Sequence, residues 1–357
     1  MAAPAAAPPR PLAAEAAVWR PAGVARRAWL RWLGFLVLVA GVVAAALASV
    51  AYGSKPIPFG TVLDAFFAFD GSNDHLIVRS LRVPRTAVGL GAGVALGLAG
   101  AVMQGVTRNP LAEPGLLGVN AGASLAVVIA LYAFGISDLS VYVWFAFAGT
   151  LLAALVVYGL GSLGREGPTP VKLALAGAAV SALLGSLTSA LLLLDIATLD
   201  QFRFWAVGSL AGRTGDIVRQ VAPFLAAGTV LALASARPLN ALSLGDDVAR
   251  SLGSRVGVAR AVAAGSVVLL VGSAVAAAGP IGFVGLTVPH VARAICGPDY
   301  RWVLPYSALL APLLLLVADV VGRVVARPAE LEVGIVTAFV GAPFFVALVR
   351  RRKLAEL

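Results

Sequence analysis

Charged residues are scarce in this chain. Only 12% of its 357 residues are Asp, Glu, Lys or Arg, whereas 60% are apolar and the mean hydropathy is +0.94. Soluble globular domains usually carry about twice this charged fraction, so the composition excludes water as the main solvent. The length would allow two soluble domains, but no polar linker divides the chain. The sequence therefore predicts one continuous membrane-embedded bundle.

Cysteine, histidine and lysine are also rare. A single cysteine, Cys296, excludes an intrachain disulfide. The two histidines, His75 and His290, lie far apart in the sequence, which argues against a metal or haem site in the membrane. None of the three lysines follows the glycine-rich pattern of a phosphate-binding loop. We therefore expect no metal, no cofactor and no nucleotide site, so any ATP would be bound by another subunit.

Long apolar segments take the place of these groups. A membrane span needs about 20 mostly apolar residues. Ten segments approach this length: Leu33–Tyr52, Thr86–Val106, Leu116–Phe134, Val141–Leu163, Leu173–Leu194, Val221–Ala236, Ala261–Ala278, Phe283–Ile295, Val303–Val321 and Val333–Val349. The prediction is an all-α polytopic membrane protein with about ten transmembrane helices. Residues 1–28 are expected to form a disordered cytoplasmic tail, and residues 29–357 the transmembrane domain.

Two of these segments have unusual features. The eighth follows Gly279-Pro280 and contains Pro289, which favours a broken helix that is buried by its neighbours. The second carries five glycines between Gly89 and Gly100, which would let other helices approach closely. Ala- and Gly-rich composition alone would also explain these glycines.

The distribution of basic residues predicts the orientation. If the N-terminus is cytoplasmic, 18 of the 27 basic residues lie inside with seven acidic ones, a net charge of +11. The remaining nine basic and ten acidic residues give −1 outside. The formal charge of +10 is therefore a topology signal, and nucleic-acid binding is not expected. Both termini are predicted to be cytoplasmic.

The spans contain almost no charge near their centres. A charge there costs about 2.5–3.5 kcal/mol on insertion scales. His290 is the midspan candidate, and we expect it to bond a carbonyl that Pro289 leaves unpaired. An ion-coupled secondary transporter would need a membrane-buried carboxylate, and a membrane-embedded enzyme would need paired ionisable groups. Both remain alternatives that this pattern does not favour.

Four polar segments interrupt the apolar pattern. In LRVPRT, Arg82 and Arg85 flank Pro84 on the predicted outer side, against the positive-inside bias. They either anchor the helix at the interface or dock an acidic partner, and we favour docking. QGVTRNPLAEPGLLGVNAG, residues 104–122, places polar side chains beside the hydrocarbon at a predicted inner turn.

The other two segments lie in the second half. LGDDVARSLGSRVG, residues 244–257, predicts a short helix that Asp246 caps, that runs through Arg250 and that ends at Gly253. Such a helix could lie on lipid or sit in the cleft of a soluble partner. The last segment begins with GPIGFVGLTVPHVARAICGPDYRWVLP, residues 279–305. It continues through VADVVGR to PAELEVGIVTAFVGAPFF, which ends at Phe345.

In these four segments the chain resembles the iron–siderophore and cobalamin permease family of type II ATP-binding-cassette importers. The resemblance extends from Leu33 to Lys353. It implies ten spans per subunit, a second permease subunit in a homodimer or heterodimer, two cytoplasmic ATPase subunits and an extracytoplasmic binding protein. It also implies a bacterial inner-membrane location. The expected activity is inward transport of an iron–siderophore by ATP-driven alternating access, with cobalamin or haem as alternative substrates.

The resemblance also implies roles for individual residues. Docking of the binding protein is expected at Arg82, Arg85 and Arg323. Coupling to the ATPase is expected at Leu244, Gly245, Asp246, Asp247, Ala249, Arg250, Leu252 and Gly253. An inner gate is expected at Thr169 and Pro170, although Pro170 departs from the small polar residues that are frequent there. Gln104, Asn109 and Asn120 are expected to line the translocation path.

Overall fold

Every regular element of the described chain is a helix, as predicted. The computed structural model describes residues 22–163 and 169–350. Ten apolar helices coincide with the ten predicted segments: α1 (Ala22–Ala51), α4 (Val83–Thr107), α5 (Val119–Phe134), α6 (Leu139–Gly161), α7 (Pro170–Leu194), α9 (Gly215–Ala234), α12 (Val256–Ala278), α13 (Val284–Cys296), α14 (Tyr300–Val325) and α15 (Val333–Arg350). Seven of them are long and apolar enough to cross a membrane, and α5, α13 and α15 are shorter apolar helices. Residues 1–21 of the predicted tail lie outside the described residues.

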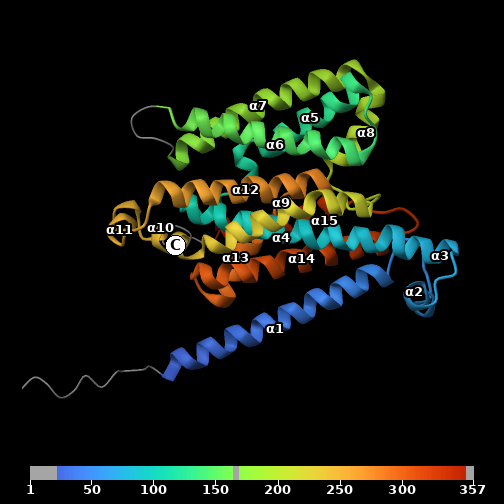
Figure 1. Cartoon of the computed structure of the whole chain (residues 1–357), viewed down its shortest axis with the longest axis horizontal. Helices are drawn as coiled ribbons and strands as arrows, with labels where there is room; N and C mark the ends of the chain where they lie inside the picture. Colours follow the sequence, from blue (N-terminus) through green and yellow to red (C-terminus); the bar gives the residue numbers. More distant parts are fainter. Residues whose placement is uncertain (1–21, 164–168, 351–357) are drawn as a thin grey trace, which may run out of the picture.

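Short helices gather at the two ends of the bundle (Figure 1). One end carries α2 (Phe59–Phe67), α3 (Asn73–Leu76), the π-helical turn η1 (Ile77–Arg82) and α8 (Ile196–Ala206). The opposite end carries α10 (Ala236–Ser243) and α11 (Asp246–Ser251). A 3₁₀ turn, η2 (Pro114–Leu117), precedes α5. We call the end that carries α3 the α3 end, and the end that carries α11 the α11 end.

Helix α4 is the centre of the bundle and packs against α9, α12, α13 and α14. Its small residues make this possible, because a side chain at Gly97 would overlap the Ser307 carbonyl of α14. A side chain at Gly100 would likewise overlap the Gly285 carbonyl of α13. The predicted close approach at this glycine stripe is confirmed.

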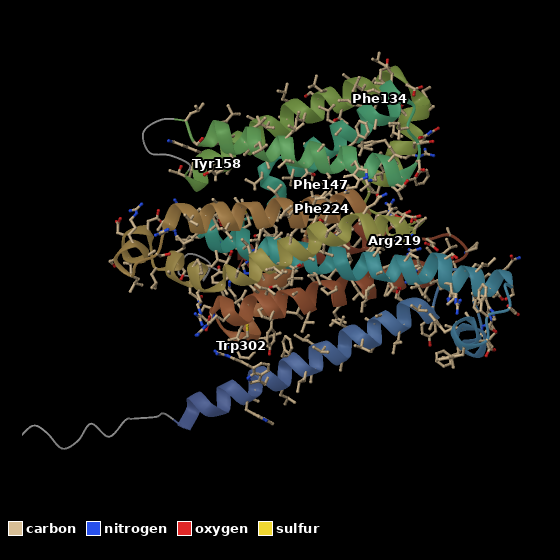
Figure 2. All side chains as sticks on the ribbon, viewed as in Figure 1. Phe134, Phe147, Tyr158, Arg219, Phe224 and Trp302 are labelled. Carbon is tan, nitrogen blue, oxygen red and sulfur yellow. The ribbon has the colours of Figure 1, made fainter. Side chains whose placement is uncertain are left out.

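Two groups of helices flank this centre (Figure 1). Helices α5, α6, α7 and α8 form a bundle on one side, and α6 meets α9 where the Phe147 and Phe224 rings lie 4.7 Å apart (Figure 2). Helix α1 lies on the opposite side and packs on α14, where the Trp32 and Trp302 rings are 5.0 Å apart. Helix α1 therefore lies at the periphery of the bundle, and specific contacts must hold it to the other helices.

The helix ends differ from the prediction in one important respect. Helix α4 begins at Val83 and α14 continues to Val325, so both extend about one turn beyond the predicted spans. Arg85 and Arg323 consequently lie inside apolar helices, together with Asp319, which the predicted ninth span already included in its last turn. The prediction of spans with almost no charge is therefore corrected at the α3 end.

Candidate functional site

The three arginines predicted to dock a binding protein come together at the α3 end. Arg82 lies in η1, Arg85 in the first turn of α4 and Arg323 in the last turns of α14. They are only 4%, 8% and 1% exposed. Their guanidinium groups therefore point into the protein, and their partners are groups of the same chain.

Arg82 and Arg323 bind the free end of α1. The last four carbonyls of a helix lack partners within the helix, and positive charge is favourable there. Arg82 Nη1 donates to the carbonyls of Val50 and Ala51, at 3.0 and 2.6 Å. Arg323 Nη1 donates to the carbonyl of Ser49 at 3.0 Å. These bonds satisfy the carbonyl end of α1 and attach this peripheral helix to α4 and α14.

Two carboxylates balance the arginines. Asp319 is fully buried and accepts from Arg85 Nη2 and from Arg323 Nη2, both at 2.7 Å. Glu330, in the loop after α14, accepts from Arg85 Nη1 at 2.6 Å. Burial alone would raise the pKa of Glu330, but the hydrogen bond and charge of Arg85 outweigh it and hold this pKa below its usual value. We call Arg82, Arg85, Arg323, Asp319 and Glu330 the arginine clasp.

A second polar cluster lies inside the bundle around Gln104. Pro289 has no N–H, so the carbonyl of Gly285 loses its helical donor in α13. Gln104 Nε2 reaches this carbonyl at 3.5 Å and that of Leu286 at 3.2 Å, and its Oε1 accepts from Arg293 at 2.7 Å. Gln104 is 2% exposed. Gln104 therefore has a packing role in α13, and its role in the translocation path stays a prediction.

The segment between α4 and η2 is fixed to α13 by two further contacts. His290 Nε2 lies 2.8 Å from the carbonyl of Pro110. The expectation that His290 bonds a carbonyl freed by Pro289 is therefore wrong, since Gln104 fills that role. Glu113 Oε1 accepts from the backbone N–H of Phe283 at 3.2 Å. The polar run that the sequence singled out is thus part of the packing of α13, which is a continuous helix and not the broken one that was predicted.

The other predicted path and gate residues have local partners. Asn109 is exposed and its Oδ1 accepts from the N–H of Leu111 at 2.9 Å, which closes a turn. Asn120 is half-buried in the first turn of α5. Thr169 caps α7, whose first residue is Pro170. Residues 164–168, on the other side of the predicted gate, lie outside the described residues. The path role of both asparagines and the gate role stay predictions.

The α11 end carries the third cluster. The predicted helix is present, but its N-cap is Gly245, whose φ of +103° suits glycine. The predicted capping by Asp246 is wrong. Its carboxylate instead accepts from Arg260 Nη2 at 2.9 Å and from Arg108 Nη2 at 3.2 Å. Arg108 follows α4 and Arg260 lies in the first turns of α12. Asp246 therefore links α11 to α4 and to α12.

The outward side of this helix exposes a row of apolar side chains beside charged ones. Leu244, Val248 and Leu252 are spaced four residues apart and are 61%, 45% and 66% exposed, and we call them the α11 stripe. Ala249 is fully buried against the bundle. Arg250 pairs with the exposed Asp247 at 2.8 Å. A short helix with one buried face and one exposed apolar stripe has the form of a docking element.

No three His, Cys, Asp or Glu side chains within residues 22–163 and 169–350 are grouped so that they could hold a metal ion.

Comparison with known proteins connects these features to a family. The FecCD transport family matches residues 38–351. The probable siderophore transport system permease protein YfiZ of Bacillus subtilis is 43% identical over 328 residues, 92% of this chain and 98% of that protein. The ferric enterobactin transport system permease protein FepD of Escherichia coli is 49% identical over 320 residues, 89% of this chain and 94% of that protein.

A solved structure has the same architecture. It is an inward-facing conformation of a metal-chelate type ABC transporter, with a TM-score of 0.77 and 27% sequence identity. The match covers 89% of this chain and 98% of that one. The arrangement of α1 to α15 is therefore shared over nearly the full length of both chains.

Proposed function

The chain belongs to the FecCD transport family, and from this premise we propose that it carries an iron–siderophore complex inward as the permease subunit of an ATP-binding-cassette importer. One observation carries the substrate class: the chain is similar over nearly its whole length to permeases named for siderophore and ferric enterobactin transport. The apolar helices make it a multi-span membrane protein.

The proposed assembly follows from this membership. A second permease subunit would complete the translocation path, two cytoplasmic ATPase subunits would bind ATP, and an extracytoplasmic protein would deliver the ligand. We propose an inner-membrane location with both termini in the cytoplasm. The α11 end is then cytoplasmic and the α3 end faces the binding protein.

We propose that α11 transmits the motion of the ATPase. Its stripe of Leu244, Val248 and Leu252 is the apolar surface that a cleft in a soluble partner would cover. On the inner side, Asp246 holds Arg108 and Arg260. A displacement of α11 would therefore move the ends of α4 and α12 together. The ATPase dimer would bias the two states of the path through its different contacts with α11 in each state.

We propose that the binding protein docks at the α3 end, where the arginine clasp fixes the surface loops. Arg82 Nη2 donates to the carbonyl of Lys55, and Arg327 Nη2 to that of Gly53, at 2.6 and 2.7 Å. Arg85→Glu separates direct docking from this structural role. Loss of binding-protein affinity with an unchanged thermal midpoint would support direct contact, and a joint loss of affinity and stability would support the clasp alone.

Uptake into proteoliposomes tests the function as a whole. The chain is reconstituted with its ATPase and binding protein, and accumulation of a radioactive ferric siderophore is measured. We expect accumulation that needs internal ATP and survives collapse of the proton gradient. Proton-driven uptake without ATP would contradict the proposal that the chain is part of an ATP-driven importer. Transport of cobalamin or haem in place of the siderophore would contradict the substrate class and leave the importer intact.

A further inference from the structure

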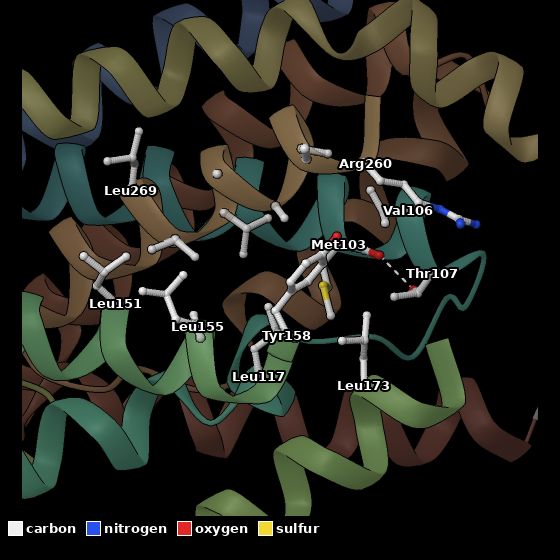
Figure 3. A pocket seen from close by; sticks show the side chains of 17 residues that line it. Met103, Val106, Thr107, Leu117, Leu151, Leu155, Tyr158, Leu173, Arg260 and Leu269 are labelled. Carbon is white, nitrogen blue, oxygen red and sulfur yellow. Dashed lines mark hydrogen bonds between the residues drawn. The ribbon is translucent and has the colours of Figure 1, made fainter. Parts of the chain in front are cut away.

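A cavity of about 420 Å³ lies between α6, α7, α4 and α12 at the α11 end (Figure 3). Its walls are almost entirely apolar, formed by side chains such as Met103, Leu117, Leu155, Val268 and Leu269. It does not include any residue of the arginine clasp, the Gln104 cluster or the α11 stripe. The cavity therefore needs an explanation of its own.

The depth of the cavity matches one membrane leaflet. It runs along α12 from Arg260, near the start of the helix, to Leu269 near its middle. Nine residues of helix rise about 14 Å, and half of a hydrocarbon core is about 15 Å. A cavity of about 150 Å³ holds a benzene ring of six carbons. By that scale, 420 Å³ accommodates a chain of about 16 carbons.

A cation stands at the mouth. In Figure 3 the guanidinium of Arg260 points out of the cavity at the end where Thr107 lies. The Arg260 side chain is 24% exposed, and among the described residues it donates only from Nη2, to Asp246. An arginine has five N–H donors, so the Nε and Nη1 hydrogens are available. Thr107 offers no competing donor, because its hydroxyl donates to the carbonyl of Met103 at 2.7 Å.

We infer that this cavity binds one anionic phospholipid from the leaflet at the α11 end. An acyl chain fills the apolar space, and the phosphate accepts hydrogen bonds from Arg260 at the mouth. Basic pockets between transmembrane helices are suited to such headgroups, and the apolar walls hold an acyl chain by van der Waals contact along its length. Because Arg260 also holds Asp246, the bound phosphate lies next to the attachment of α11.

Gly265 gives a direct way to block the cavity. It lines the wall on α12, and a Cβ placed there would meet no other atom within 4 Å. The Cβ of Gly265→Phe therefore starts in open space on the cavity wall, and the substitution removes a glycine from a helix interior, which favours folding. Gly159 on α6 is the matched control, because its Cβ also meets no atom and it does not line the cavity.

Lipid retention by the full-length chain tests the proposal. The protein is purified in mild detergent and incubated with phosphatidylglycerol or phosphatidylcholine that carries 16-carbon chains. Native mass spectrometry then counts bound lipids. We expect one retained phosphatidylglycerol, about tenfold less retention in Gly265→Phe, and unchanged retention in Gly159→Phe. Arg260→Gln should lower the preference for phosphatidylglycerol over phosphatidylcholine about tenfold, since the guanidinium attracts the net negative charge of phosphatidylglycerol, whereas the choline cation offsets the phosphate charge in phosphatidylcholine.

Three results would overturn the inference. Equal retention by wild type and Gly265→Phe would mean that no chain enters the cavity. Equal retention of the two lipids by wild type would mean that Arg260 does not select an anionic headgroup. Inorganic phosphate that competes as strongly as the lipid would indicate an anion site without an acyl chain. The Arg260→Gln arm remains informative even if Gly265→Phe folds poorly.

Discussion

The two ends of the bundle use arginine in opposite ways. At the α3 end, Arg82, Arg85 and Arg323 are at most 8% exposed, and their partners are helix carbonyls and buried carboxylates. At the α11 end, the side chains of Arg108 and Arg250 are 41% and 60% exposed, and their partners lie on a surface helix. Buried arginines hold the fold together, whereas exposed ones leave a surface that a partner can use.

Electrostatics explains why this difference is large. Exposed ion pairs contribute about 0–1 kcal/mol, because water and salt screen them. A buried pair has no water to replace a missing partner, so removal of one side leaves an uncompensated charge. Substitutions at the α3 end should therefore change stability, and substitutions at the α11 end should change coupling.

Arg323→Met should have the largest effect on stability. It removes one of the two arginines that neutralise Asp319 and the donor to Ser49 at the end of α1. We expect a loss of about 3–5 kcal/mol, measured by unfolding in mixed micelles. Arg219→Met is the control, since the Arg219 side chain is 80% exposed and, within residues 22–163 and 169–350, pairs only with Asp216. Equal effects of the two substitutions would contradict the comparison between buried and exposed arginines.

Gln104→Leu should come next. It removes the side-chain donor to the carbonyls of Gly285 and Leu286 and the acceptor of Arg293 Nη1. A buried polar group that loses its hydrogen bond costs about 1–3 kcal/mol, so the thermal midpoint should fall. The exposed Gln201 provides the control, and Gln201→Leu should change the midpoint little. A wild-type midpoint for Gln104→Leu would show that these bonds do not support α13.

Asp246→Asn should affect coupling more than stability. The amide carries no charge to hold Arg108 and Arg260, so ATP hydrolysis and uptake should become partly uncoupled, with a stability loss of about 1 kcal/mol. The neighbouring Asp247 has a side chain that is 99% exposed, and Asp247→Asn serves as the matched control. The measurement is the number of ATP molecules hydrolysed per substrate transported, and an identical ratio in both variants would count against this link.

Glu330→Gln should give the smallest effect, and it depends on pH. The folded state holds the pKa of Glu330 below its usual value, so its stabilising contribution is present above the unfolded-state pKa. It is lost as the pH falls through the folded-state pKa. The difference in thermal midpoint between wild type and Glu330→Gln should therefore hold from neutral pH down to the unfolded-state pKa, about 4.3, and shrink as the pH falls further. A difference that stays constant would indicate that Arg85 does not act on the charge of Glu330.

Much of the fold could be predicted because its signals are local. Apolar segments of span length located all ten helices, and Gly100 marked a close approach, whereas the helix that Pro289 was expected to break is continuous. The partners of the charged residues are not local. Arg85 and Asp319 are 234 positions apart, and nothing near either residue shows that they meet. We therefore predicted that these arginines form a docking surface. They do converge at one end of the bundle, as predicted, but their side chains are buried.

The candidate site shows the same contrast between local features, which the sequence predicts, and contacts between distant residues, which it does not. The short helix at residues 246–251 and its exposed stripe are readable from nearby residues. The role of Asp246 is not, because Arg108 and Arg260 come from other parts of the chain. Gln104 was similarly singled out as polar beside hydrocarbon, but its partner carbonyls are 181 and 182 positions away.

The central claim is that the working surface of this permease lies on α11, and affinity for the ATPase subunit tests it most directly. Leu252→Asp places a charge in the α11 stripe, on a side chain that is 66% exposed. We expect at least a tenfold loss of ATPase affinity with an unchanged thermal midpoint, because a buried unpaired charge is unfavourable at an interface. Wild-type affinity for Leu252→Asp would contradict the account.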